Sequence, residues 1–87
     1  MKISWPKSFA KKYYALPQDI RKRFDEKIRL FVENPSHPSL RVKKISGTED
    51  IWEASISKNY RWTFEWTKEL VKLRHIGTHD ILKRWQQ

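Results

Sequence analysis

The chain of 87 residues carries 19 lysines and arginines against 10 aspartates and glutamates, a formal net charge of +9, which favours nucleic acid or an acidic protein as a partner. Its length fits one domain over residues 1–87. The absence of cysteine excludes disulfides and thiolate metal sites, and no apolar run approaches the roughly 20 residues that span a bilayer.

The N-terminal segment predicts a short strand and then a helix. Lys2–Trp5 is a candidate edge strand, and Pro6 suits the first turn of a helix. Phe9, Tyr13 and Leu16 recur at the spacing of one apolar helix face. The basic start lacks the apolar stretch of a signal peptide, so we expect a cytoplasmic protein.

A second helix is predicted from about Pro17 to Glu33. Pro17 breaks the first helix and opens this one, and Asn34-Pro35 ends it. Its apolar stripe is formed by Ile20, Phe24, Ile28 and Phe31. The two helices are expected to form a hairpin with a shared apolar side.

Strands are predicted for the rest of the chain. NPSHPS, residues 34–39, has the composition of a loop, and Leu40–Ile45 follows as a strand with Leu40, Val42 and Lys44 on one side. Three more strands occupy Ile51–Ile76, with connections at residues 58–59 and 67–69. Gly77 is expected to end the last strand, and residues 78–87 to form a helical turn or an extended flap.

The predicted order is β-α-α-β-β-β-β, an α+β domain with the helical hairpin on one face of a small, mostly antiparallel sheet. Period-two alternation in Ile51–Ile76 separates an apolar set from a polar set. The apolar set packs on the helices, and it comprises Trp52, Ala54, Ile56, Tyr60, Trp62, Phe64 and Trp66. The polar face is left open to a ligand.

Two residues on or beside the polar face are candidates for chemistry. Arg61 interrupts the apolar series, and a guanidinium fixed on a strand can hold a phosphate through two hydrogen bonds. The alternative is an ion pair with Glu53 or Glu65. His79, just after the last strand, can move protons near neutral pH, or it is an exposed loop histidine.

Basic and aromatic residues supply candidate RNA contacts. Trp52 and Trp85 are candidates for stacking on bases. The candidate phosphate contacts are Lys43, Lys44, Lys83 and Arg84. The histidines at 37, 75 and 79 do not have a convincing metal-ligand spacing, so we expect no metal and no cofactor.

The run HPSLRVKKISGTEDIWEASISKNYRWTFEW, with LRHIGTHDIL after it, spans residues 37–82 and resembles the RelE/ParE superfamily of bacterial type II toxin–antitoxin toxins. The helical hairpin ending in ENP fits the same family. Its most specific pieces are LRVKKISG, the IWEASIS–NYRWTF hairpin and IGTHD. The resemblance covers almost the whole chain and implies a RelE-like fold.

The superfamily has two activities. RelE- and YafQ-like members cleave mRNA in the ribosomal A site without a metal, through attack of the RNA 2′-hydroxyl on the adjacent phosphate. ParE-like members inhibit DNA gyrase and are not nucleases. The resemblance implies a ribosome-dependent mRNA endoribonuclease, with gyrase inhibition as the alternative. A non-catalytic basic RNA-binding domain is the third hypothesis.

The resemblance also implies roles for particular residues. Arg61 matches the RelE arginine that contacts the scissile phosphate, and His79 matches a histidine of YafQ-like toxins. Trp85 falls where RelE has a functional tyrosine. Glu53 and Ser55 stand where RelE has two catalytic lysines, so Glu53 or His79 is expected to act as base and acid.

The family implies partners as well. These are a cognate antitoxin with an acidic toxin-binding segment, mRNA and the ribosome, and operator DNA bound through the toxin–antitoxin complex. DNA gyrase replaces RNA and ribosome in the alternative.

Overall fold

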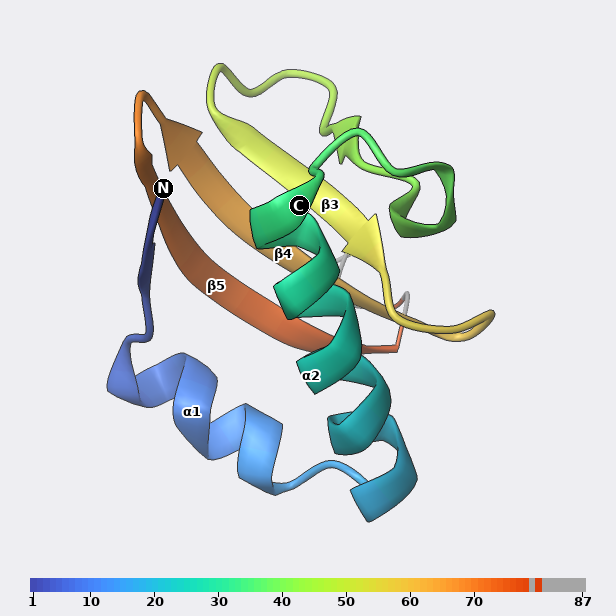
Figure 1. The fold of residues 1–87 in the computed structure, drawn as a ribbon. Helices are drawn as coiled ribbons and strands as arrows, with labels where there is room; N and C mark the ends of the chain where they lie inside the picture. The colour runs from blue at the N-terminus through green and yellow to red at the C-terminus, as the bar shows by residue number, and fades with distance from the viewer. Residues whose placement is uncertain (79, 81–87) are drawn as a thin grey trace.

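A computed structural model describes residues 1–78 and 80 (Figure 1). The two helices are α1 (Lys7–Tyr14) and α2 (Gln18–Glu33), and a short 3₁₀ helix, η1, covers Pro38–Leu40. The strands are β1 (Lys2–Ser4), β2 (Lys43–Lys44), β3 (Ile51–Ser55), β4 (Tyr60–Thr67) and β5 (Leu70–Thr78). The predicted order of helices and strands is confirmed.

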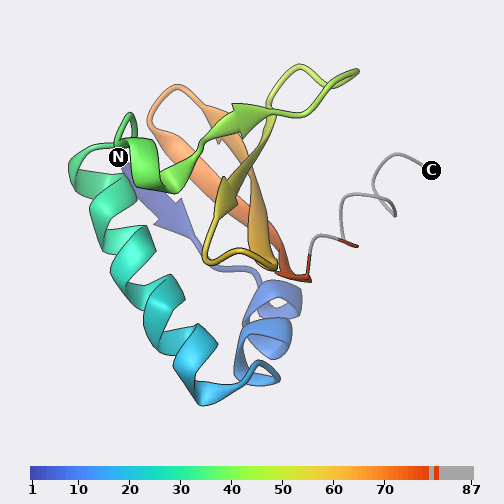
Figure 2. The same cartoon turned by 90° about the vertical axis from the view of Figure 1, so that its right-hand side faces the viewer.

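The strands form one five-stranded sheet in the order β1-β5-β4-β3-β2. β1 runs parallel to β5 at one edge, and every other neighbouring pair is antiparallel. Both helices lie on the same side of the sheet, with α2 crossing in front of the central strands (Figures 1 and 2). This is the predicted α+β architecture.

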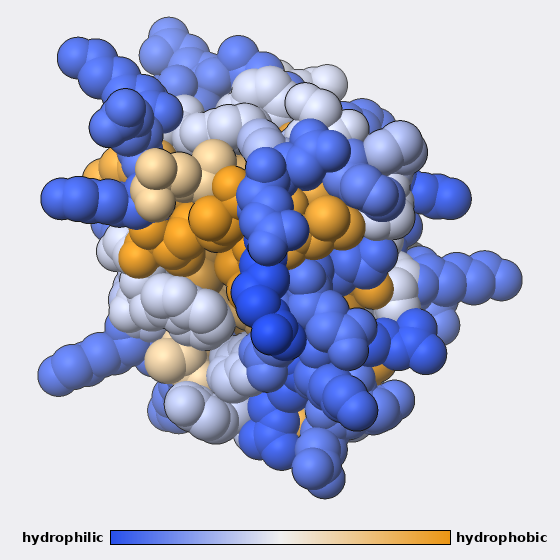
Figure 3. Space-filling model, in the orientation of Figure 1, coloured by the Kyte–Doolittle hydropathy of each residue, from blue (hydrophilic) through white to orange (hydrophobic). Residues whose placement is uncertain are grey.

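Proline and asparagine set the helix ends. Pro6 and Pro17 are the residues just before α1 and α2, and Asn34 is the residue just after α2. A stripe of hydrophilic residues runs along the side of the molecule that Figure 3 shows, with hydrophobic residues beside it, and Val32 of α2 is exposed. No helix among the described residues is long and apolar enough to cross a lipid bilayer.

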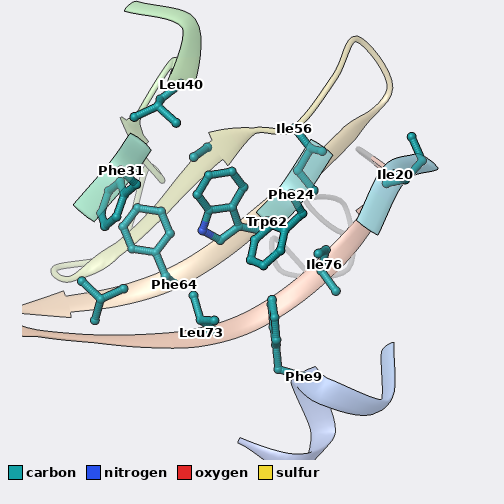
Figure 4. Packing of buried hydrophobic residues seen from close by; sticks show 12 residues of the cluster. Phe9, Ile20, Phe24, Phe31, Leu40, Ile56, Trp62, Phe64, Leu73 and Ile76 are labelled. Carbon is teal, nitrogen blue, oxygen red and sulfur yellow. The ribbon is translucent and has the colours of Figure 1, made fainter. Parts of the chain in front are cut away.

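The core lies between the helices and the sheet and is rich in aromatic rings (Figure 4). Trp62 is fully buried at its centre, edge-on to Phe24 with ring centroids 5.2 Å apart. Phe31 belongs to the same cluster and packs against Phe64, with ring centroids 5.0 Å apart. These contacts confirm the apolar stripe of α2 and the apolar set of the sheet as the two halves of the core.

The strand predicted over Leu40–Ile45 is wrong in extent. Leu40 ends η1, Arg41 has a left-handed backbone (φ 49°), and only Lys43–Lys44 pairs with β3. The predicted alternation is broken, because Leu40 and Ile45 are both buried. A residue with a left-handed backbone interrupts the extended conformation, so the alternation of side chains between the two faces of a strand does not continue through it.

The last strand is longer than expected. β5 continues through Gly77 to Thr78, and Gly77 pairs with Arg61 of β4. The connection from β4 is shortened to Lys68 and Glu69, because Thr67 already pairs with Leu70. Lys68 takes the positive φ (46°) of this tight turn.

A hydrogen bond joins α1 to α2 where the sequence predicted only apolar contacts. The Tyr13 hydroxyl donates to the Asp25 carboxylate over 2.6 Å. Burial, and then the Asp25 hydrogen bond, raise the pKa of Tyr13 to about 12 from its ordinary 10.0. The folded state therefore retains the Tyr13 proton at pH values where the unfolded chain has lost it.

Tyr13→Phe is expected to lower the free energy of unfolding at pH 7 by about 1 kcal/mol, the usual net value of one hydrogen bond. Because the folded-state pKa is raised, the stabilisation by Tyr13 is complete below pH 10 and is lost as pH rises through about 12. Urea unfolding at pH 7 and pH 11 measures both effects, and the difference between wild type and Tyr13→Phe should shrink at pH 11. Tyr14→Phe is the matched control, since Tyr14 is 69% exposed. A constant difference between the two pH values would contradict the prediction.

Candidate functional site

The β3–β4 hairpin and β5 place Arg61 in a defined cross-strand row. Arg61 pairs with Ser55 on β3 and with Gly77 on β5. Directly opposite residues of antiparallel strands point to the same face of the sheet. Gly77 has no side chain, so the β5 residue paired with Arg61 places no side chain opposite it.

The Arg61 guanidinium is anchored through one nitrogen. Nη1 donates to the Ser55 hydroxyl (3.0 Å) and to the carbonyl oxygens of Ser57 (2.6 Å) and Tyr60 (3.1 Å). Nη2 and Nε make no hydrogen bond to any described residue. The side chain is thus held in place while two of its nitrogens are left to donate to a ligand.

The ion pair considered for Arg61 is not formed. Neither Glu53 nor Glu65 pairs with it, and Glu65 instead lies 3.9 Å from Arg74. Hydroxyl and carbonyl oxygens orient Arg61 without neutralising its charge. A full positive charge on a rigid strand suits an anionic ligand.

A second row on the same face runs beside Arg61. It joins Lys43 of β2, Glu53 of β3, Thr63 of β4 and His75 of β5. The Glu53 carboxylate is half-buried and has no hydrogen-bond or ion-pair partner among the described residues. The tertiary structure therefore brings Arg61, Glu53 and Lys43 onto one face, in adjacent rows.

The hydroxyl groups of this face are internal rather than presented to solvent, contrary to the expectation of an open polar face. Ser55 is 8% and Thr63 is 2% exposed. Ser55 donates to the Ser57 carbonyl while it accepts from Arg61, and Thr63 accepts from the backbone N–H of His75. These hydroxyls hold the site together.

Two histidines have structural contacts. Lys12 Nζ lies 2.9 Å from His75 Nδ1, and because an ammonium only donates, His75 accepts through Nδ1. His37 Nδ1 accepts from the backbone N–H of Ser39 and caps η1. Among residues 1–78 and 80, no group of three histidine, aspartate or glutamate side chains is placed to hold a metal.

Two predicted RNA-contacting residues lie away from Arg61. Trp52 belongs to the helix-covered face and packs edge-on against Trp66 with centroids 5.6 Å apart. Lys44 pairs with Trp52 across β2 and β3, so it shares that face. The structure does not bring either of them together with Arg61.

The predicted residues His79, Lys83, Arg84 and Trp85 lie outside the described residues. Their roles stay predictions.

Sequence reasoning missed the anchoring role of Ser55 and Ser57. The alternation predicts Ser55 only as a polar residue of the open face, at a position where the family has a lysine, and it predicts no role for Ser57. The pairing of the two hairpin strands could have revealed the role of Ser55, because a connection of residues 56–59 places Ser55 opposite Arg61. The carbonyl of Ser57 has no sequence signal at all, because every residue carries one.

Comparison with known proteins finds similarity in structure only. No protein-family model matches the sequence, and no curated protein matches it. RelE in the RelB–RelE antitoxin–toxin complex from Methanococcus jannaschii is similar in structure, with a TM-score of 0.78 and 22% identity over 97% of this chain and 99% of that one. YafQ from Escherichia coli has a TM-score of 0.76 and 15% identity over 93% and 96% of the two chains.

A third similar structure is the YoeB/ParE toxin from Agrobacterium tumefaciens, with a TM-score of 0.75 and 15% identity over 91% of this chain and 99% of that one. All three matches span nearly the full length of both chains. This chain therefore has the RelE-like fold of toxins from toxin–antitoxin systems.

Proposed function

We propose that this protein is the toxin of a type II toxin–antitoxin pair and that it cleaves mRNA on the ribosome without a metal ion. The RelE-like fold supports the toxin role. The observation that carries the enzymatic proposal is the anchoring of Arg61 through Nη1, with Nη2 and Nε unused. Such an arginine fits the oxygens of one phosphate.

The proposed reaction uses only groups of the protein and the RNA. The 2′-hydroxyl attacks the adjacent phosphorus and gives its proton to a base, while the bond from phosphorus to the 5′-oxygen breaks and that oxygen takes a proton from an acid. The products are a 2′,3′-cyclic phosphate and a 5′-hydroxyl. Negative charge grows on the non-bridging oxygens in the transition state, and Arg61 stabilises it there.

Glu53 and His79 are the proposed base and acid. Glu53 lies on the Arg61 face, and its carboxylate is not occupied by an ion pair with a described residue. Lys43 shares this face and is exposed, so we propose that it contacts the RNA backbone, as do Lys83 and Arg84, and that Trp85 stacks on a base.

A cognate antitoxin is the proposed protein partner. The solved complexes of RelE with RelB and of YafQ with DinJ are antitoxin–toxin complexes. The net charge of +9 suits an acidic antitoxin segment. We propose that the pair binds its own operator DNA.

The test is to induce the protein in cells and map mRNA 5′ ends for wild type, Arg61→Ala and His79→Ala. Cuts in phase with codons, lost in both variants, are the expected result. Growth arrest with intact mRNA and an induced DNA-damage response would instead identify a gyrase inhibitor. The absence of any toxicity would leave a non-catalytic RNA-binding domain.

A further inference from the structure

A pocket of about 700 Å³ lies between the middle of α2, the segment around η1 and the β3–β4 connection. We call it the basic pocket. Figure 1 shows these segments around one region beside α2, and Figure 3 shows mainly hydrophilic residues on that side. Its charged lining residues are Arg23, Glu26, Lys27, Arg41, Lys58 and Arg61. Its volume falls in the range of small-ligand sites.

The basic pocket concentrates positive charge that the protein does not neutralise. Five cationic side chains line it against the single carboxylate of Glu26. None of the five forms an ion pair with a carboxylate of a described residue. Like charges gathered around one cavity repel each other, so an anion bound there is favourable.

Local structure directs two of these cations to the pocket. Arg41 has a left-handed backbone (φ 49°), a conformation that is uncommon for a residue with a side chain. Lys27 of α2 is within 3.5 Å of the Ser39 carbonyl, which joins the helix to the η1 segment. The pocket walls therefore come from several separate elements of the fold, α2, the segment around η1 and the β3–β4 connection, and not from one loop.

We propose that the basic pocket binds the phosphate groups of the RNA strand that neighbour the phosphate held by Arg61. The proposal rests on the proposed function, since Arg61 belongs both to the reacting site and to the pocket lining. A strand whose reacting phosphate lies on Arg61 continues along the end of the β3–β4 hairpin. Its next phosphates then meet Arg41 and Lys27.

RNA fits this lining better than an acidic polypeptide does. Three of the five cations are arginines, whose planar guanidinium groups bind phosphate through paired hydrogen bonds. The lining is mainly polar and charged, with one apolar residue, Ile56. An acidic protein segment that folds on binding needs apolar contacts beside its charges, and the pocket offers few.

The test measures binding of a fluorescent single-stranded DNA oligonucleotide, which lacks the 2′-hydroxyl and cannot be cleaved, to the full chain at several salt concentrations. The pocket variant is Lys27→Gln with Arg41→Gln. The control variant is Lys7→Gln with Lys22→Gln, which removes two exposed cations that do not line the pocket. Circular dichroism of each variant confirms that the proteins compared are folded.

The pocket variant is expected to bind the oligonucleotide more weakly than wild type. The slope of log affinity against log salt concentration should be shallower by about 1.4, which is about 0.7 for each lost phosphate contact. The control should change this slope by less than half as much. Equal changes in both variants would overturn the proposal, because the pocket would then act only through net charge.

Two further readouts separate this proposal from the proposed function. Binding of polyglutamate is compared with binding of the oligonucleotide for wild type and for the pocket variant. If the two substitutions weaken the binding of polyglutamate but not that of the oligonucleotide, the occupant is an acidic protein and the proposal is overturned. A wild type that binds the oligonucleotide through the pocket but does not cleave mRNA would refute the proposed function and leave phosphate binding by the pocket intact.

Discussion

Arg61→Ala is expected to lower the rate of mRNA cleavage by about 100- to 1,000-fold, the usual loss when one donor to a developing oxyanion is removed. The reason is geometric, because Ser55, Ser57 and Tyr60 hold one guanidinium nitrogen and leave two for phosphate oxygens. Single-turnover cleavage of ribosome-bound mRNA measures the rate, since it separates the chemical step from release.

Arg61→Lys separates charge from geometry. A lysine keeps the positive charge but cannot satisfy three protein acceptors and a phosphate in the same fork. We therefore expect its rate to lie between those of wild type and Arg61→Ala. If charge alone matters, Arg61→Lys will match wild type.

The matched control is Arg29→Ala. Arg29 is an exposed arginine of α2 that donates a hydrogen bond to the backbone carbonyl of Asp25. Its removal lowers the net charge by the same amount as Arg61→Ala, so a rate close to that of wild type is expected. Folding of Arg61→Ala is checked by circular dichroism, because the buried Ser55 hydroxyl loses a donor. Unchanged cleavage by a folded Arg61→Ala protein would refute the role of Arg61.

Trp62→Ala is expected to lower the free energy of unfolding by about 3–5 kcal/mol, the range for large buried aromatic residues. Trp62 is 0% exposed and packs against Phe24 and Phe31 of α2. The loss is a large part of the stability of a typical domain, which is about 5–15 kcal/mol. Urea unfolding followed by circular dichroism measures the loss, and the midpoint of unfolding should fall to a much lower urea concentration.

Trp62→Phe should be much less damaging. The Trp62 indole N–H is buried and has no hydrogen-bond acceptor in the described part of the chain. Phenylalanine keeps most of the apolar contact and removes this unpaired donor, so its cost is expected to be below about 2 kcal/mol. Val32→Ala is the surface control, since Val32 is 45% exposed and such changes are usually within about 0.5 kcal/mol. Equal losses for Trp62→Phe and Trp62→Ala would contradict this account of the core.

The helices and the central strands were predictable because their signals are local. Pro17 and Asn34-Pro35 act on their own backbone, and apolar periodicity over Ile20, Phe24 and Phe31 is a property of one helix. The same holds for alternation along β4, which correctly separated Trp62 and Phe64 from Arg61. Each signal needs only neighbouring residues, so the sequence carries it in full.

Segments with weak or interrupted periodicity were not predictable in the same way. The left-handed Arg41 ends the regular pattern after η1, and the strand there shrinks to Lys43–Lys44. Likewise, the parallel pairing of β1 with β5 joins residues at opposite ends of the chain. Such pairing depends on where the helices carry the chain, which no local pattern records.

The sequence by itself determined the order of helices and strands, the two halves of the core and the choice of Arg61 as a phosphate-binding candidate. Only the tertiary structure decided how Arg61 is held, because its acceptors are a hydroxyl and two backbone carbonyls brought close by the hairpin register. It also decided that cations from α2, Arg41 and the β3–β4 connection share one pocket. Charges distant in sequence act together only once folding fixes the distances between them, and electrostatic energy depends on those distances.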